Sequence, residues 1–174
     1  MKKFELTTES ITNEAGKKLF RIKALIDFGD VKAGELGGYV EKEGNVSQDD
    51  NAWVSGDAEV FGNAKVSGNA KVSGNAWVSG NARVYGDARV SGNAWVSGDA
   101  DYALVQGFGT EFRCTTFYRG KDKKIMVNCG CFHGNLEAFR KQAKETRSGK
   151  IAKEYLMIAD LMEYHFASED SSDE

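Results

Sequence analysis

The chain has 174 residues, of which 41% are hydrophobic and 28% charged, and its formal net charge at pH 7 is −3. This length suits one compact protein of one or two parts, and the charge excludes a global basic field for nucleic acid. Three cysteines argue against a disulfide framework and fit a reducing cytoplasm. Neither a signal peptide nor a membrane span of about 20 apolar residues is indicated. We therefore expect a cytoplasmic protein with no membrane partner.

The first 38 residues carry two strand-like patterns. Residues 3–7 and 19–26 combine β-branched, aromatic and aliphatic side chains, and the turn-like stretch 12–18 separates them. A glycine-rich stretch, 27–40, follows. This part of the chain predicts a small N-terminal β structure.

A six-residue repeat then fills residues 54–101 in eight ungapped copies, and less regular units with a two-residue insertion precede it over 39–53. The copies read VSGDAE, VFGNAK, VSGNAK, VSGNAW, VSGNAR, VYGDAR, VSGNAW and VSGDAD. A helix needs a period near 3.6 and a plain strand a period of 2, so a strict six predicts a stacked parallel β-solenoid. Valine and the alanine two positions before it should point inward, and glycine followed by Asn or Asp should form each corner.

Valine followed four positions later by alanine, in all eight units, resembles the left-handed parallel β-helix of the hexapeptide-repeat proteins. The resemblance implies a triangular coil of three hexapeptides, or 18 residues per turn. We therefore expect a mainly β fold: a short left-handed parallel β-helix with an N-terminal β cap and a C-terminal ββαα unit.

Residues 18 apart should stack on adjacent coils, about 4.8 Å apart. The corner columns then become Asp57–Asn75–Asn93, Asn63–Asn81–Asp99 and Asn51–Asn69–Asp87. No column places one carboxylate directly on another, whereas Asn side chains can hydrogen-bond along a stack. The distribution of Asn and Asp therefore supports this register.

Beyond residue 101 the repeat stops and a different unit is predicted. Residues 115–119 and 125–131 are strand-like around the turn 120–124, and Asn135 offers an N-cap for a helix over 136–147. A second helix is expected over 151–167, with a core-facing stripe formed by Ile151, Tyr155, Ile158, Met162 and Phe166.

A solenoid leaves unpaired strand edges at both ends, so each end should carry a cap. The predicted organisation is therefore an N-terminal cap (1–38), the repeat β-helix (39–103), a C-terminal α/β unit (104–167) and a disordered acidic tail (168–174).

The repeat fixes the interior and leaves the outward positions free, so binding residues are expected on the faces of the coil. One face should carry Glu59, Trp77 and Trp95 in a column; a second, Lys65, Arg83 and Asp101; the third, Trp53, Lys71 and Arg89. The candidate binding residues are Trp77, Trp95, Phe61, Trp53, Lys71, Arg89, Arg83 and Tyr85. An outward tryptophan pair indicates a covered surface, and the cover could be the chain's own C-terminal unit, a second copy or a foreign partner.

Catalytic and metal chemistry has less support. Cys129, Cys131 and His133 would share one face of a strand near Cys114, a ligand set that suits zinc, but the spacing is not C-x₂-C, and cysteine is often simply buried. Many hexapeptide-repeat proteins are acyltransferases with a histidine base, yet the repeats here contain no histidine, and the second histidine, His165, also lies in the C-terminal unit. No metal, cofactor or catalytic residue is predicted.

The sequence GELGGYVEKEGN, the repeats, and TTFYR and CGCF before paired helices together resemble small bacteriophage and prophage proteins. The resemblance implies a mobile-element protein. We expect a non-enzymatic protein that binds and inhibits a host macromolecule in the bacterial cytoplasm, in a concrete version a defence nuclease or nucleoprotein complex blocked in the manner of an anti-CRISPR protein. A phage protein, or a second copy bound through a β-helix face, is a further expected partner. Direct nucleic-acid binding has little support, because each basic column carries only two or three basic residues. An acyl-CoA-dependent acyltransferase and a nucleotide-signal-sequestering binder are the alternatives.

Overall fold

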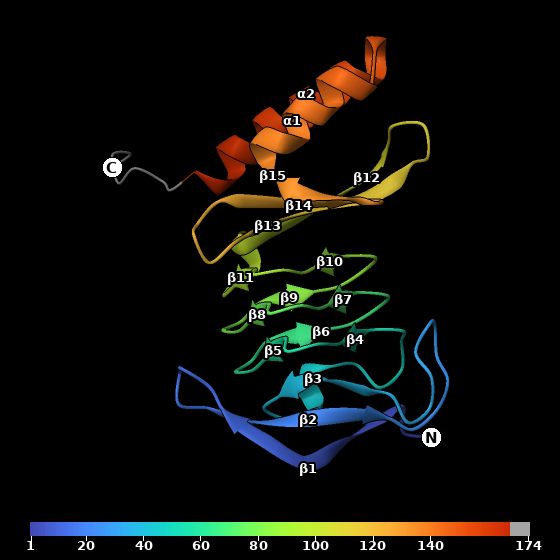
Figure 1. Cartoon of the computed structure of the whole chain (residues 1–174), viewed down its shortest axis with the longest axis vertical. Helices are drawn as coiled ribbons and strands as arrows, with labels where there is room; N and C mark the ends of the chain where they lie inside the picture. The colour runs from blue at the N-terminus through green and yellow to red at the C-terminus, as the bar shows by residue number, and fades with distance from the viewer. Residues whose placement is uncertain (168–174) are drawn as a thin grey trace.

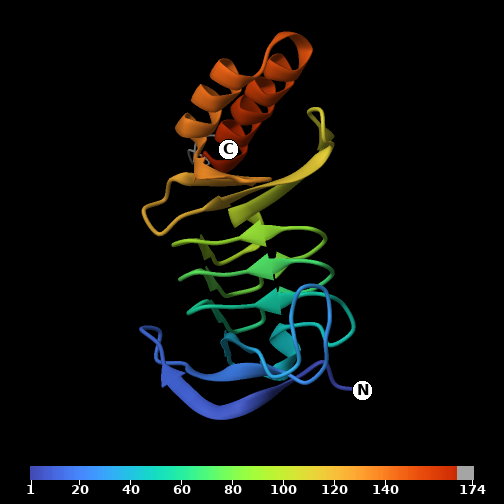
Figure 2. The ribbon, with the colours of Figure 1, turned by 45° about the vertical axis from the view of Figure 1, so that its right-hand side comes forward.

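The computed structural model describes residues 1–167 and shows three layers stacked along the long axis of the molecule (Figures 1 and 2). N-terminal strands form one end, a β-solenoid forms the middle, and a second sheet covered by two helices forms the other end. The acidic tail predicted over 168–174 lies outside the described residues. None of the helices described combines the length and apolar character needed to cross a membrane.

The solenoid is built from eight two-residue strands. They are β4 (Trp53–Val54), β5 (Glu59–Val60), β6 (Lys65–Val66), β7 (Lys71–Val72), β8 (Trp77–Val78), β9 (Arg83–Val84), β10 (Arg89–Val90) and β11 (Trp95–Val96). Strands 18 residues apart pair in parallel, giving the faces β5–β8–β11, β4–β7–β10 and β6–β9. The predicted coil of three hexapeptides is thereby confirmed. Val40 pairs with Val60 and Val46 with Val66, both at an offset of 20, so the 3₁₀ turn η1 (Glu43–Asn45) adds no residue. Trp53 pairs with Lys71 at an offset of 18, which places the predicted two-residue insertion between Val46 and Trp53.

The repeat valines and alanines fill the interior of the coil as predicted. From Ala52 to Val96 each is at most 2% exposed. The corner glycines from Gly56 to Gly92 have φ between +61° and +68°, the left-handed region that glycine adopts without steric cost. Gly98 is instead extended, with φ −158°, and there the chain leaves the coil through the 3₁₀ turn η2 (Asp99–Asp101).

The corner side chains form the expected ladders along the stack. Asn51 donates to Asn69, and Asn69 donates to Asp87, each at 3.0 Å. Equivalent bonds join Asn63 to Asn81 (3.2 Å) and Asn75 to Asn93 (3.5 Å). Asp87 is thus kept beside an amide instead of a second carboxylate.

The N-terminal strands close the first edge of the solenoid. β1 (Phe4–Thr12), β2 (Lys18–Ala24) and β3 (Leu36–Val40) are antiparallel, and β3 continues in parallel into β5, so that one sheet runs β1-β2-β3-β5-β8-β11. N–H groups such as those of Trp53 and Ser55 donate to carbonyls of the following coil, so the equivalent carbonyls of the first coil need other donors at this edge. Side-chain donors meet them: Lys3 Nζ donates to the carbonyl of Ala52 (2.8 Å), and Asn45 Nδ2 donates to that of Ala64 (2.9 Å).

At the opposite edge, N–H groups of the last coil have no further coil above them, and side-chain acceptors meet several of them. The backbone N–H of Arg83 donates to Asp99 Oδ1, and that of Arg89 donates to Thr116 Oγ1, both at 3.0 Å. Asp101 accepts hydrogen bonds from the backbone N–H of Ser97 and from Nε of Arg119, both at 2.9 Å. Burial acts against ionisation of Asp101, but the bonds from Ser97 and Arg119 outweigh it and lower the pKa of this carboxyl.

The C-terminal unit contains the two predicted strands and helices, and two further strands flank them. Their bounds are β12 (Tyr102–Phe108), β13 (Arg113–Arg119), β14 (Ile125–Cys129), β15 (Phe132–Asn135), α1 (Leu136–Thr146) and α2 (Gly149–Phe166). The strand predicted over 125–131 is in fact a hairpin, because Gly130 turns the chain at φ +61° and Cys129 pairs with Phe132. Asn135 caps α1 as predicted, accepting from the N–H of Ala138 at 2.8 Å.

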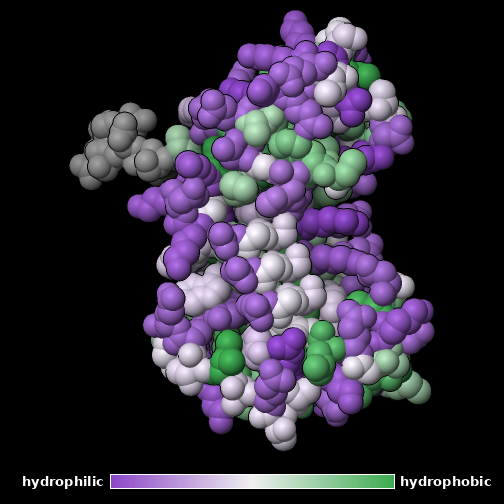
Figure 3. All heavy atoms as spheres, in the orientation of Figure 1, coloured by the Kyte–Doolittle hydropathy of each residue, from purple (hydrophilic) through white to green (hydrophobic). Residues whose placement is uncertain are grey.

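The C-terminal sheet packs across the last coil and covers its exposed edge. Tyr102 and Tyr118 are buried in the core that continues from the solenoid. The helices cover the other side of the sheet through a separate core that includes Phe117, Phe139, Ile158, Met162 and Phe166, so the apolar stripe predicted for α2 does face inward. In the view of Figure 3, strongly apolar residues lie mainly towards the two ends, while the solenoid between them is hydrophilic or neutral.

We expect Asn69→Asp to destabilise the fold by about 1–2 kcal/mol at pH 7, because it removes the amide that donates to Asp87 and places two carboxylates on adjacent coils. Urea unfolding measures this loss, which should shrink at high salt or at a pH low enough to protonate the pair. Asn93→Asp is the matched control, because Asn93 only accepts along its ladder and has no carboxylate beneath it. Equal losses in the two variants would contradict the ladder argument.

Lys3 generates a pH prediction. The residue is 2% exposed, and its burial, which outweighs the attraction of Asp50 and Asp49, lowers the pKa of its ammonium group to about 8. Between this value and the ordinary value of 10.5 the unfolded chain binds more protons, so stability should rise with pH. The free energy of unfolding of the wild type should therefore grow relative to that of Lys3→Met from pH 7.5 to 9.5. A constant difference in denaturant titrations over this range would contradict the prediction.

Candidate functional site

The three faces of the solenoid differ in what covers them. The face β5–β8–β11 carries the predicted column Glu59, Trp77 and Trp95, and the parallel register places these residues directly in line. Phe61 contacts Trp77, and Trp77 contacts Trp95, each edge-to-face with ring centroids 5.3 Å apart. Solvent exposure differs between the two ends of this aromatic row. Phe61 packs against Leu19 of β2 and is 7% exposed, whereas Trp95 is 37% exposed.

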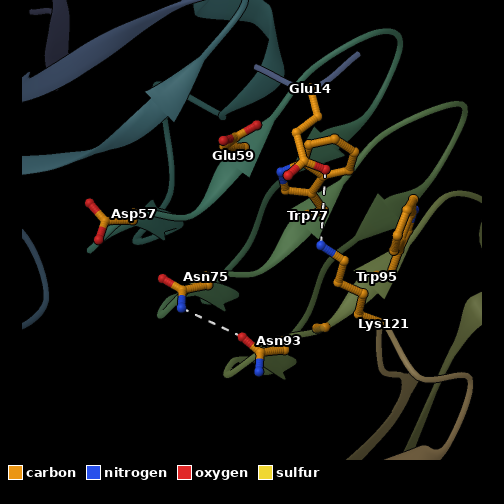
Figure 4. Close-up of a pocket in the computed structure, with 9 residues that line it drawn as sticks. Glu14, Asp57, Glu59, Asn75, Trp77, Asn93, Trp95 and Lys121 are labelled. Atoms are coloured by element: carbon orange, nitrogen blue, oxygen red, sulfur yellow. Dashed lines mark hydrogen bonds and ion pairs between the residues drawn. The ribbon is translucent and has the colours of Figure 1, made fainter. Parts of the chain in front are cut away.

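A cavity of about 320 Å³ opens beside the two tryptophans (Figure 4). We call it the tryptophan pocket, and its lining residues are Glu14, Asp57, Glu59, Asn75, Trp77, Asn93, Ala94, Trp95 and Lys121. Asp57, Asn75 and Asn93 form one corner column of the coil, while Glu59 and the tryptophans form the neighbouring outward column. Repeat geometry therefore sets most of this wall.

The two ends of the molecule supply the rest of the pocket. Glu14 comes from the turn between β1 and β2, and Lys121 comes from the turn between β13 and β14. Lys121 Nζ lies 4.0 Å from Glu14 Oε2 and 5.9 Å from the centroid of the Trp95 ring (Figure 4). The covering expected for the tryptophan face is thus partial and comes from both caps: the N-terminal strands cover Phe61, and a single C-terminal lysine reaches Trp95.

The face β6–β9 is basic and open. Lys65 and Arg83 occupy adjacent coils, are exposed, and form no ion pair with any residue between 1 and 167. Two depressions, of about 840 and 500 Å³, share this pair of residues, and Lys42 lines the smaller one. We call Lys42, Lys65 and Arg83 the basic face. The predicted stacking of Asp101 on Arg83 is wrong, since η2 turns Asp101 toward Arg119.

Tyr85 borders the basic face. It is 57% exposed and packs edge-to-face on Tyr102, with ring centroids 6.3 Å apart. Burial is the main cause that raises the pKa of Tyr102 to about 12, and the neighbouring Tyr85 is the next largest. Tyr102 is therefore uncharged at neutral pH, and Tyr85 offers a flat ring beside the cations.

The third face, β4–β7–β10, is largely closed by the chain itself. Trp53 is only 3% exposed, because Phe4 and Phe28 pack on it, so its predicted role as an accessible binding residue is corrected to one in packing. Lys71 forms an ion pair with Asp30, and their hydrogen bond lowers the pKa of the Asp30 carboxyl. The side chain of Arg89 is exposed, at the edge where β13 meets the coil.

The histidines and cysteines do not assemble as the sequence suggested they could. The hairpin turn at Gly130 separates Cys129 from Cys131, and no three His, Cys, Asp or Glu side chains of the described residues are grouped to hold a metal ion. Thr115 Oγ1 donates to Cys129 Sγ at 3.1 Å. His165 is exposed on α2.

His133 belongs to a network that fastens the sheet to the coil. Its Nε2 lies 3.1 Å from the hydroxyl of Tyr118, a fully buried residue whose hydroxyl also meets Ser91 Oγ and Asn128 Nδ2. Asn128 in turn donates to the carbonyl of Arg89 at 2.8 Å. These contacts join the C-terminal sheet to the last coil.

Sequence patterns could not have found Glu14 or Lys121 as site residues. Both lie in turns, and nothing in the repeat states over which face a cap extends its loops. Asp57 carried a usable signal, since the corner column places it beside Glu59 on the coil.

Comparison with known proteins bears on the solenoid alone. Two stretches, 64–80 and 82–98, match the family model of the YdcK beta solenoid repeat. Both lie inside the eight-unit array and support a repeat β-helix. A search of the curated proteins found no match.

Proposed function

We propose that this chain is a non-enzymatic interaction protein that binds and inhibits a host macromolecule through the tryptophan face of its solenoid. The observation that carries the proposal is the tryptophan pair: Trp77 and Trp95 stack along a flat sheet and border an open pocket. Exposed tryptophan is enriched among residues that dominate binding energy.

The scaffold suits this role because it holds the pair in place before a partner arrives. The valine and alanine core beneath β8 and β11 is fully buried, and backbone bonds such as Trp77 N–H to Ala94 O (2.8 Å) fix the two tryptophans relative to each other. A preorganised surface loses less conformational entropy on binding.

In its concrete form the partner is a bacterial defence nuclease or nucleoprotein complex, and the chain is a phage- or prophage-encoded inhibitor acting in the host cytoplasm. The resemblance of nearly the whole chain to small phage proteins of the hexapeptide-repeat type supports this version. A second copy of the chain is the competing occupant of the same face.

We expect Trp95→Ala to abolish capture of the partner from host lysate while leaving the fold intact, because Trp95 is partly exposed and lies outside the coil interior. The measurement is affinity capture with mass spectrometry and absorbance at 260 nm on the eluate, supported by circular dichroism. Tyr164→Ala is the matched control: it also removes an exposed aromatic side chain, here 83% exposed on α2.

Capture that is equal for the wild type and Trp95→Ala would overturn the proposed face. Dissociation of a homo-oligomer by Trp95→Ala, with no foreign protein captured, would assign the face to a second copy. Turnover of acyl-CoA that is lost in His133→Ala would replace the proposal with the acyltransferase.

The basic face favours a second candidate function, the sequestration of a nucleotide signal. Lys65 and Arg83 place like charges on adjacent coils, an arrangement that an anion would stabilise. The carboxylate of Asp99 lines the same depressions, but it accepts from the backbone N–H of Arg83 and forms no ion pair with either side chain. Tyr85 adds a ring on which a base can stack.

For this candidate we expect a panel of cyclic and linear nucleotides to raise the melting temperature of the wild type but not of Lys65→Gln/Arg83→Gln. Added salt should weaken the effect, because phosphate contacts with exposed cations are screened. Differential scanning fluorimetry measures the shifts, with chromatography to show that the nucleotide is not turned over. Lys18→Gln/Lys23→Gln, which removes two cations from the N-terminal strand β2, controls for net charge. Equal shifts in both double variants would exclude the basic face.

A further inference from the structure

We infer that the tryptophan pocket receives a cationic side chain, arginine or lysine, presented by the partner protein. The inference rests on the proposed function and names the chemistry that this face recognises. It is carried by the charge at the rim of the pocket, by the aromatic wall, and by a lysine of the chain itself that already lies against that wall.

The rim of the pocket carries more negative than positive charge. Glu14, Asp57 and Glu59 line it with carboxylates, and Lys121 is the one cation among its lining residues. Asn13 Nδ2 donates to Glu59 Oε2 at 2.9 Å, whereas no hydrogen bond or ion pair to the Asp57 carboxylate is found within residues 1–167.

One more cation acts on this rim from the N-terminal sheet. Burial lowers the pKa of Arg21, but Tyr39 and Glu9 outweigh it, so that the pKa is raised. The attraction of Asp57 adds a smaller contribution in the same direction. Arg21 is already committed: its guanidinium lies 2.7 Å from the Tyr39 hydroxyl and 3.4 Å from Glu9 Oε1. The carboxylates of the pocket thus remain unbalanced and attract a positive group.

The wall of the pocket suits a cation as well. Indole has the most favourable aromatic face for cation–π attraction, which acts within about 6 Å of the ring centroid. Trp77 and Trp95 meet edge-to-face at 72°, so they present two differently oriented rings along one side of the cavity. A volume of about 320 Å³ is near the lower limit for ligand pockets, about 300 Å³, which fits a single side chain.

Lys121 shows where such a group would lie. Its ammonium group is 5.9 Å from the Trp95 centroid and 4.0 Å from Glu14, the arrangement expected of a cation between an aromatic wall and an acidic rim. The Lys121 and Glu14 side chains are 64% and 79% exposed, and an ion pair this open contributes little. A cation from a partner can therefore displace Lys121 at small cost, and Lys121 acts as a competitor within the chain.

The experiment is a titration of the purified full chain followed by the indole N–H resonances of its tryptophans in two-dimensional NMR. The probe is N-acetyl-L-argininamide, and the neutral isostere N-acetyl-L-citrullinamide is the control, because the two differ in the charge of the side chain. We expect saturable shifts of the Trp77 and Trp95 signals with the arginine probe and at least fivefold weaker binding of the citrulline probe. Equal binding of both probes, or no shift with either, would overturn the inference.

Substitutions at the rim test the sign of the charge that is recognised. Asp57→Asn should weaken the arginine probe roughly two- to fivefold, the range for an exposed charge pair, and it should fold, because Asn occupies this repeat position in five of the eight units. Asp87→Asn makes the same change in another corner column and should leave binding unchanged. An unchanged affinity in Asp57→Asn would count against the inference.

Removing the internal competitor should have the opposite effect. Lys121→Gln should strengthen binding of the arginine probe roughly two- to fivefold, and Lys124→Gln, in the same turn but outside the pocket lining, should not. A Lys121→Gln variant that bound the probe more weakly would show that Lys121 does not compete with a cation for this pocket, and the inference would fail.

These titrations do not depend on a captured partner. A partner lost in Trp95→Ala but no binding of the arginine probe would leave the proposed function standing and overturn the cationic side chain. Binding of the arginine probe with no Trp95-dependent partner would support the cation site and overturn the proposed function.

Discussion

Hydrogen bonding at the two exposed edges of the stack is the constraint on which the rest of this structure depends. Parallel pairing directs the N–H and C=O groups of each coil alternately to the two neighbouring coils, so the outermost coils would leave backbone groups of both kinds without partners. An unsatisfied buried backbone group is costly. The chain therefore places Lys3 and Asn45 against carbonyls of the first coil, and Asp99, Asp101 and Thr116 against N–H groups of the last. At the last coil Asn128 also donates to the carbonyl of Arg89, so side chains cap backbone groups of both kinds there.

Capping the edges has a consequence for the surface between them. The caps must extend beyond the narrow solenoid to cover it, and their turns then overhang its faces. On the tryptophan face the turns meet, with Glu14 from one end and Lys121 from the other. The loop containing Phe28 and Asp30 extends over the third face and buries Trp53. The basic face keeps its exposed column of Lys65 and Arg83. A repeat with three nearly equal sides thus acquires three chemically distinct surfaces.

The sequence predicted most of the solenoid because every repeat unit shows which residues face the interior, which face outward and which form the corner. The 18-residue register, the buried valines and alanines and the Asn ladders all follow from that repetition, since each unit adds independent support for the same geometry. Prediction was weaker where the chain is not repeated. The turn at Gly130 was missed because a Gly between cysteines on an apolar stretch also suits a continuous strand, and β12 was missed because it begins directly where the repeat ends.

For the site, prediction reached only the residues that the coil positions. The column of Glu59, Trp77 and Trp95 could be written down from the period alone, and its contacts are those of the structure. Whether a given outward residue is accessible is not a property of the repeat: Trp53 and Trp95 occupy equivalent positions in their units, yet one is 3% and the other 37% exposed. That difference comes from where the cap loops lie, and those loops form contacts distant in sequence that no local pattern encodes.

The same reasoning explains why the junctions of caps and coil are where specificity can evolve in such a protein. A substitution within the coil interior disturbs a column of stacked neighbours, so the repeat resists change there. A substitution in a cap turn, such as at Lys121, alters the charge over the tryptophans without touching a buried contact, because that side chain is exposed and its ion pair is long. The rigid coil fixes the positions of the aromatic rings, and the two cap turns determine the charge beside those rings. In the proposed mode of binding, affinity and partner choice would therefore depend on different parts of the chain.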